Sequence, residues 1–127
     1  IVNALLKAAW VVDDKQVYLR VDRLTMVADI RAQISNGNVQ QIIIVEVKCF
    51  ADPRNDMDEL YRAVGQYLLY RSALQQRESD WPIYLAIPTA VYNRLFVKPV
   101  VQNVVTRNEI KLILVDVERE EIVQWLN

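Results

Sequence analysis

The chain has 127 residues, the length of one domain, and 53% of them are apolar, so it can bury a core and is neither disordered nor fibrous. Its 15 basic and 16 acidic residues give a net charge of −1, without the basic excess of a typical nucleic-acid-binding protein. The absence of histidine excludes His-based zinc sites and Ser-His or Cys-His nucleophiles. We therefore predict a single domain over residues 1–127, in which any catalysis uses carboxylates, lysine, tyrosine or a hard metal ion.

Cysteine usage and hydrophobic runs indicate the cellular compartment. Cys49 is the only cysteine, which excludes an internal disulfide framework and is typical of the reducing cytosol. No apolar run is long enough to cross a bilayer, and no secretory signal pattern is visible. We therefore expect a cytoplasmic protein without a membrane partner.

The first half of the chain predicts the end of a helix and then a set of strands rich in hairpins. Residues 3–10 indicate the helix end, and residues 17–21 a first strand. Residues 26–34 alternate between apolar and polar side chains and predict a second strand. The turn sequence Ser-Asn-Gly-Asn at 35–38 joins it to a third strand over 41–50. Because four successive apolar residues fill the core of that third strand, we expect it to be central and covered on both faces.

A long helix is predicted over residues 56–76. Asp56 is a candidate N-cap, and Asp58 and Glu59 suit the positive end of the helix dipole. Two apolar stripes follow helical spacing: one comprises Met57, Leu60, Tyr61, Val64 and Leu68, and the other Ala63, Tyr67, Tyr70 and Leu74. Two stripes predict a wide buried face, as in a helix pressed between a sheet and another element.

The last third of the chain predicts two further strands and two short helices. Residues 83–87 form a fourth strand between two prolines, followed by a short helix at 89–96 that begins at a Thr89 cap. Residues 100–106 indicate a helix and 110–115 a fifth strand, and the segment at 121–126 is either a last strand or a helical end. The resulting order, α-β-β-β-α-β-α-β, indicates a mixed α/β fold with a crossover helix.

Three charged residues near the end of the third strand form the candidate site. Glu46 and Lys48 project from the same face because side chains alternate along a strand. Charges at the end of so apolar a strand are costly unless they are paired or face a cleft. Because the hairpin turn is centred near residue 37, Asp29 is expected to lie across the strand pair from roughly position 45. We therefore expect two carboxylates and one ammonium group to converge at one end of the sheet.

This combination predicts a site that cleaves phosphodiesters. Asp29 and Glu46, together with the Val47 carbonyl, offer hard oxygen ligands to Mg²⁺ or Mn²⁺. The ion would polarise a phosphate and activate a bound water, which Lys48 would orient or deprotonate. The alternative is structural: an Asp…Glu-x-Lys pattern also arises by chance, and Glu46 and Lys48 then form an ordinary salt bridge at the end of a strand.

A second candidate feature is Gln66-x-x-x-Tyr70 on the long helix. Positions i and i+4 share one face of a helix, so Gln66 could reach the end of the sheet and orient a ligand or a phosphate. Gly65 beside it weakens the helix and indicates close approach of another backbone. The alternative is a surface glutamine next to a core tyrosine.

Several segments carry a resemblance to one family: Leu5-Leu6-Lys7, Val45-Glu46-Val47-Lys48, Ala63-Val64-Gly65-Gln66-Tyr67, Tyr84-Leu85-Ala86-Ile87-Pro88, Ile110-Lys111-Leu112-Ile113 and Ile122-Val123-Gln124-Trp125. Over nearly its whole length the sequence resembles the XisH family of fdxN-element excision controlling factors. The resemblance implies a restriction-endonuclease-like PD-(D/E)XK core, a central mixed β-sheet flanked by helices. It also implies a role in DNA excision during heterocyst development in cyanobacteria, alongside a site-specific recombinase and a small companion excision factor.

The same resemblance implies a set of catalytic residues. It places the superfamily's site at Asp29, Glu46 and Lys48, with Asp29 and Glu46 as ligands of Mg²⁺ or Mn²⁺. It also matches Gln66 and Tyr70 to the Gln-x-x-x-Tyr element of RecB-like nucleases. The chain departs from the superfamily pattern because no proline precedes Asp29 and the predicted first helix has no acidic residue.

Two functional hypotheses remain open from the sequence. In the first, the chain is a Mg²⁺-dependent endonuclease-like protein that acts on DNA, which the Asp29, Glu46 and Lys48 set favours. In the second, the nuclease fold is a scaffold for a non-catalytic regulator that acts through the recombinase or the companion factor. The near-neutral charge favours the second, because phosphate contacts normally dominate DNA affinity. A twofold symmetric homodimer is the default expectation for either.

Overall fold

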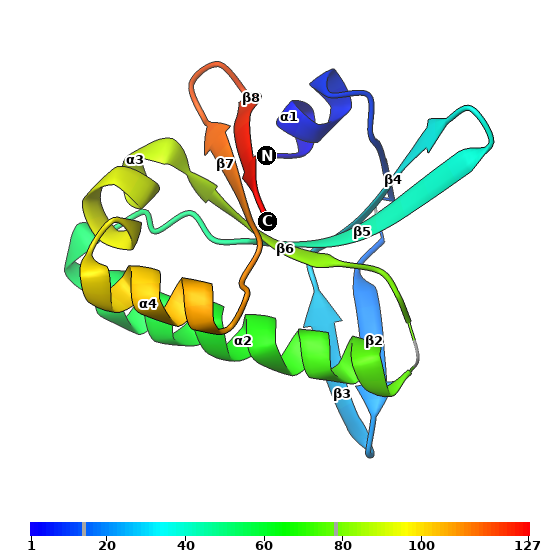
Figure 1. Cartoon of the computed structure of the whole chain (residues 1–127), viewed down its shortest axis with the longest axis horizontal. Coiled ribbons are helices and arrows are strands. Elements are labelled where there is room, and N and C mark those ends of the chain that lie inside the picture. Colours follow the sequence, from blue (N-terminus) through cyan, green and yellow to red (C-terminus); the bar gives the residue numbers. More distant parts are fainter. Residues whose placement is uncertain (14, 78) are drawn as a thin grey trace.

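The computed structural model describes residues 1–13, 15–77 and 79–127, and its centre is a curled mixed β-sheet with helices on its faces (Figure 1). Within these residues the central sheet has six strands, in the spatial order β1-β4-β5-β6-β7-β8. Their bounds are β1 (Val11–Asp13), β4 (Ile30–Asn36), β5 (Val39–Val47), β6 (Ile83–Pro88), β7 (Leu112–Asp116) and β8 (Glu121–Leu126). A separate two-stranded sheet pairs β2 (Val17–Val21) with β3 (Leu24–Ala28). The predicted mixed α/β class is therefore confirmed.

The helices lie on both faces of the central sheet. They are α1 (Val2–Lys7), α2 (Asp56–Gln76), α3 (Thr89–Val91) and α4 (Pro99–Arg107), with a 3-10 turn η1 (Pro53–Asn55) before α2 and a π-helical turn η2 (Tyr92–Phe96) after α3. In Figure 1, α2 and α4 run side by side below the sheet, whereas α1 lies above it near β8. Among the described helices, none is both long and apolar enough to cross a membrane.

Strand pairing places β5 in the middle of the sheet. β4 and β5 form an antiparallel hairpin, and Gly37 at its turn has φ +65°, a left-handed conformation that glycine adopts without steric cost. β5 pairs with β6 in parallel, as does β6 with β7, and parallel neighbours need a crossover connection, which α2 provides for the first pair. The predicted hairpin, crossover helix and central third strand are therefore confirmed.

The prediction of one continuous strand over residues 26–34 is wrong. The chain is extended on both sides of Asp29, but β3 pairs with β2 in the small sheet, whereas β4 pairs with β1 and β5 in the central sheet. The strand ends because the chain changes partners at Asp29, whose amide donates to the Glu46 carboxylate. Side-chain alternation cannot reveal a change of partner, and the three residues of β1 were too few to predict.

The central sheet separates two apolar clusters, which fix the direction of the side chains on β5. Ile44 belongs to the cluster on the side of α2, which includes Tyr67 of that helix. Ile43 and Val45 belong to the cluster on the opposite side, which includes Leu5 of α1. Since side chains alternate along a strand, the residue two positions after Ile44 also faces α2. That residue is Glu46.

The wide buried face predicted for α2 is only partly correct. The stripe of Ala63, Tyr67, Tyr70 and Leu74 is buried, as predicted. In the other stripe, Met57 and Tyr61 are 48% and 66% exposed, because α4 covers that flank incompletely. The two helices leave an open apolar groove of about 420 Å³ between them.

Several element ends also differ from the predictions. β5 stops at Val47, short of the predicted end at residue 50, and Phe50 has φ +50°. Asp56 is the first residue of α2 rather than its N-cap, and Thr89 makes no capping hydrogen bond because α3 begins after Pro88 in extended conformation. The sequence left either a strand or a helical end for residues 121–126, and the structure has the strand β8 there.

Candidate functional site

The first part of the candidate site is a pair of carboxylates at the junction of the two sheets. The β4–β5 register pairs Ile30 with Val45, so the preceding residue, Asp29, lies across from Glu46. The Asp29 amide donates a 3.3 Å hydrogen bond to Oε2 of Glu46, and the Val47 amide donates a 2.9 Å hydrogen bond to Oδ2 of Asp29. The structure therefore brings together the two acids that the hairpin symmetry predicted, with an offset of one residue.

Glu46 is the charged residue that is buried in the core. Only 3% of its surface is exposed. Among the described residues, the other buried side chains are hydrophobic. Burial, reinforced by the nearby charge of Asp29, raises the pKa of Glu46 to about 7, and the charge of Lys48 opposes this rise only in part. Near neutral pH this carboxyl is therefore close to its titration midpoint, and a cation that bound beside it would favour its ionised form.

Lys48 follows β5 directly and is half-buried. Its amide donates a 3.0 Å hydrogen bond to the Ala86 carbonyl, so β5 remains attached to β6 one residue beyond its end. By strand alternation, Lys48 extends from the same face as Glu46. No Glu46–Lys48 ion pair within 4.0 Å occurs in the described parts of the chain, so the ordinary salt bridge is not what the structure contains.

Tyr70 of α2 contacts the strand that leads into the same region. The Tyr70 hydroxyl donates a 3.0 Å hydrogen bond to the carbonyl of Val27, near the end of β3. Burial raises the pKa of Tyr70, and the charges of Glu46 and Asp29 add to the rise. Gln66 lies one turn earlier on this flank of α2. Its Oε1 atom is buried and has no hydrogen-bond partner among the residues described by the structure.

The carboxylate pair is a suitable holder for a hard divalent cation. Within the described residues there is no group of three or more His, Cys, Asp or Glu side chains that could hold a metal. Mg²⁺ does not need one, because it is commonly bound through one or two carboxylates and completes its shell with water and substrate phosphate. The buried Glu46 carboxylate and the exposed Asp29 carboxylate beside it fit this requirement, and their all-oxygen donor set suits Mg²⁺ or Mn²⁺ better than a softer metal.

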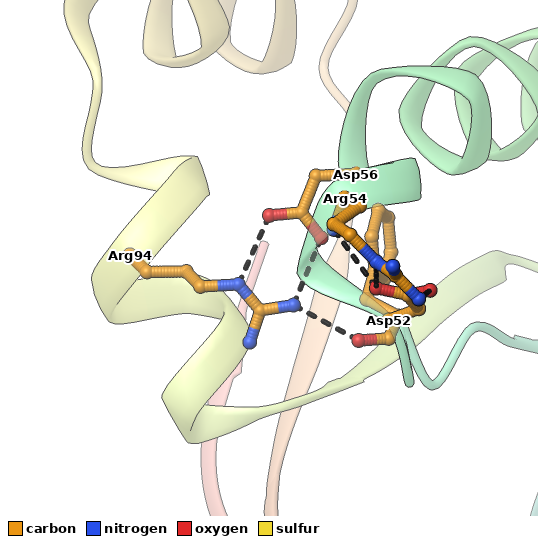
Figure 2. A network of polar contacts seen from close by, with 5 residues as sticks. Asp52, Arg54, Asp56 and Arg94 are labelled. Atoms are coloured by element: carbon orange, nitrogen blue, oxygen red, sulfur yellow. Dashed lines mark hydrogen bonds and ion pairs between the residues drawn. The ribbon is translucent and has the colours of Figure 1, made fainter.

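Sequence reasoning missed a polar network on the loop that leaves the site. Figure 2 shows Arg94 of η2 facing Asp56 at the start of α2, with Arg54 and Asp52 beside them. Arg94 donates from Nε and Nη2 to the two carboxylate oxygens of Asp56, at 3.0 and 2.9 Å, and from Nη2 to the Phe50 carbonyl at 2.9 Å. The partners are separated by 38 and 44 residues, and the sequence carries no spacing signal for such contacts.

Other hollows on the surface do not involve the candidate site. One of about 510 Å³ lies between α4 and the end of β8, where Tyr92 and Lys111 contribute to its wall. Another of about 470 Å³ lies beside β2 and includes Arg77 and Trp81. Neither is lined by the five residues predicted from the sequence, so concavity alone does not select the carboxylate pair. The burial of Glu46 without an ionic partner among the described residues does.

Comparisons with known proteins agree on one family. The sequence matches the family described as XisH, XisH protein, over residues 1–123. Two solved structures are similar over the whole chain: an fdxN element excision controlling factor protein from Anabaena variabilis, and an XisH family protein from Nostoc punctiforme PCC 73102. The sequence identities are 32% and 30%, respectively. In both comparisons the TM-score is 0.89, and the match covers 100% of this chain and 95% of the other. No curated protein matches the sequence.

Proposed function

Because the chain belongs to the XisH family, we propose that it is a DNA-element excision controlling factor whose candidate site hydrolyses phosphodiester bonds with a divalent cation. The relative from Anabaena variabilis is described as an fdxN element excision controlling factor, which supports the first part. The second part is supported by the Asp29–Glu46 pair and the neighbouring Lys48.

The observation that carries the catalytic proposal is the burial of Glu46 beside a second carboxylate. A carboxylate with 3% exposure normally has an ionic partner, because desolvating a charge is costly. Glu46 instead faces the like charge of Asp29, and its pKa is raised to about 7. Strongly perturbed groups of this kind gather at functional sites, where the arrangement serves chemistry rather than stability.

The residues divide into roles that follow from their positions. Asp29 and Glu46 would hold Mg²⁺ or Mn²⁺, together with the carbonyl of Val47. When bound, the cation supplies polarisation of a phosphate and a more acidic water. Lys48 extends from the same face as Glu46, so it orients the attacking water and offsets negative charge that develops on the phosphate. Gln66 provides an amide whose buried oxygen can accept a hydrogen bond from a ligand, and Tyr70 fixes the carboxylates through the end of β3.

The strand order supports a restriction-endonuclease-like PD-(D/E)XK core as the fold. The antiparallel β4–β5 hairpin, the crossover through α2 and the parallel β6 form one continuous unit. In this unit Asp29 precedes β4, and Glu46 and Lys48 lie at the end of β5. All three therefore lie at the same end of the sheet, as the superfamily's site requires.

A non-catalytic regulator is the second candidate function, and the charge balance favours it. With 15 basic and 16 acidic residues, the chain lacks the excess of cations that normally supplies DNA affinity. In this alternative it would act through a site-specific recombinase or a small companion excision factor. We propose these as partners under either function, with a twofold homodimer as the assembly and the cytoplasm as the location, whereas DNA is the substrate only under the catalytic function.

The test is cleavage of supercoiled plasmid and of single-stranded DNA in Mg²⁺ or Mn²⁺. Wild type is compared with Glu46→Ala and Lys48→Ala, and the matched control is Glu121→Ala, which removes an exposed carboxylate from the edge strand β8. We expect nicking by wild type and by the control, and its loss in both site variants. Absence of cleavage by folded wild type, alone and with its companion factor, would favour the regulator.

A further inference from the structure

Arg94 lies outside the five predicted site residues, yet it contacts the loop that connects Lys48 to α2. Its guanidinium binds both oxygens of Asp56 (Figure 2). It also binds the carbonyl of Phe50, two residues beyond Lys48. We call the Arg94 guanidinium, the Asp56 carboxylate and the Phe50 carbonyl the clamp. The planar guanidinium donates to all three acceptor oxygens at once, which a lysine ammonium cannot reproduce in the same geometry.

The backbone that the clamp holds is strained. Phe50 has φ +50°, a left-handed conformation that is unfavourable for a residue with a Cβ and persists only where the surroundings impose it. Two contacts from the same π-helical turn impose it here. Arg94 holds the carbonyl of Phe50, and Phe96 packs edge-on against its buried ring, with 5.9 Å between ring centroids. π-Helical turns of this kind are often found at functional sites.

The clamp is one of two anchors on either side of Lys48. On the sheet side, the Lys48 amide is bound to the Ala86 carbonyl. On the loop side, only the exposed Cys49 separates Lys48 from the clamped Phe50. The backbone on both sides of Lys48 is therefore held, by the last hydrogen bond of the sheet and by the clamped turn at Phe50.

We propose that Arg94 is a positioning residue, which holds Lys48 beside Glu46 through the Phe50 carbonyl, with Asp56 fixing its guanidinium. The catalytic consequence rests on the proposed hydrolytic function, but the placement of Lys48 does not. Arg94 acts through the backbone, and among the described residues it makes no hydrogen bond or ion pair with Asp29 or Glu46. A purely structural role, in which Arg94 only ties η2 to the start of α2, is the competing explanation.

The experiment measures the position of Lys48 in the metal-free protein by NMR, through its side-chain chemical shifts and its nuclear Overhauser contacts with Glu46. Arg94→Met removes the guanidinium, and Arg94→Lys keeps the charge for Asp56 in case the first variant unfolds. The matched control is Arg54→Ala, which breaks the exposed Arg54–Asp52 pair on the same loop without touching Phe50. We expect lost or weakened Lys48–Glu46 contacts in both Arg94 variants and wild-type contacts in the control.

Kinetics provide a second measurement on the same variants. Misplacing a catalytic group by about 1 Å can cost about 100-fold in rate, so we expect kcat to fall about 10- to 100-fold in Arg94→Lys with KM and Mn²⁺ affinity unchanged. Unchanged Lys48 signals in a folded Arg94 variant would overturn the proposal. If wild type neither binds Mn²⁺ nor cleaves DNA, the hydrolytic function fails, and the NMR comparison still decides whether Arg94 positions Lys48.

Discussion

Two charged clusters flank the loop after β5, and each contains a carboxylate whose pKa is shifted in the opposite direction to the other. In the clamp, hydrogen bonds from Arg94 lower the pKa of Asp56, so this carboxylate is ionised and fully partnered. In the candidate site, burial and the charge of Asp29 raise the pKa of Glu46 to about 7. The clamp is complete without a ligand, whereas the acidic pair gains stability only when a cation or a proton joins it. This difference separates a cluster that holds the backbone from one that is available for chemistry.

The largest expected effect concerns the cost of ionising Glu46. Its pKa is raised from 4.5 to about 7 in the folded chain, so folding favours the protonated carboxyl. That stabilisation is complete below pH 4.5 and is lost as the pH rises through about 7, by about 3 kcal/mol in total. We therefore expect Glu46→Gln, which cannot ionise, to be more stable than wild type at pH 8 and equally stable at pH 4, in urea unfolding with EDTA.

The same measurement on Asp56→Asn sharpens the comparison. The pKa of Asp56 is lowered in the folded chain, so its contribution to stability is present above its ordinary pKa and is lost as the pH falls below it. Asp56→Asn should therefore be less stable than wild type at pH 8, with a sign opposite to that of Glu46→Gln. Equal pH dependence of wild type and Glu46→Gln would contradict a buried acid with a raised pKa.

A bound cation should offset the free-energy cost of ionising Glu46 beside Asp29. A ligand that binds only the folded state at 100 times its Kd stabilises that state by about 2.7 kcal/mol. We expect Mn²⁺ at that level to raise the free energy of unfolding of wild type at pH 8, and to do so less at pH 5, where protons compete for Glu46. Asp29→Asn and Glu46→Gln should lose the effect, and the exposed-carboxylate control Glu121→Gln should keep it. Equal stabilisation of all four proteins would show that Mn²⁺ binds elsewhere.

The sequence predicted the parts of the site that depend on strand periodicity and hairpin symmetry. Alternation placed Glu46 and Lys48 on one face, and reflection through the turn brought Asp29 to within one residue of its partner. Contacts between elements distant in sequence were not predictable in this way. The change of sheet at Asp29 and the Arg94–Phe50 hydrogen bond depend on how separate elements pack, and no local pattern encodes that packing. The catalytic roles themselves stay predictions.

A smaller effect is expected from two neighbours on α2. The Tyr67 hydroxyl donates to the Ile83 carbonyl and accepts from the Lys111 amide, whereas the buried Oε1 of Gln66 has no partner within the described residues. A buried polar group without a partner costs about 1–3 kcal/mol. Gln66→Leu should therefore raise the stability of the ligand-free protein by about 1 kcal/mol and lower DNA cleavage, whereas Tyr67→Phe should lower stability. Urea unfolding and plasmid nicking measure both, and destabilisation by Gln66→Leu would show that the amide serves the fold.

The smallest expected effect comes from the ion pair next to the clamp. Arg54 binds Asp52 on the same loop, but its side chain is 89% exposed, and water screens such a pair. Arg54→Ala should therefore leave the midpoint of urea unfolding unchanged at low and at high salt, whereas Arg94→Met should lower it because the Phe50 carbonyl loses its donor. If Arg54→Ala destabilises the chain as much as Arg94→Met, the loop is held by its charges in general. The hydrogen bond from Arg94 to Phe50 would then matter no more for the position of Lys48 than the exposed ion pair does.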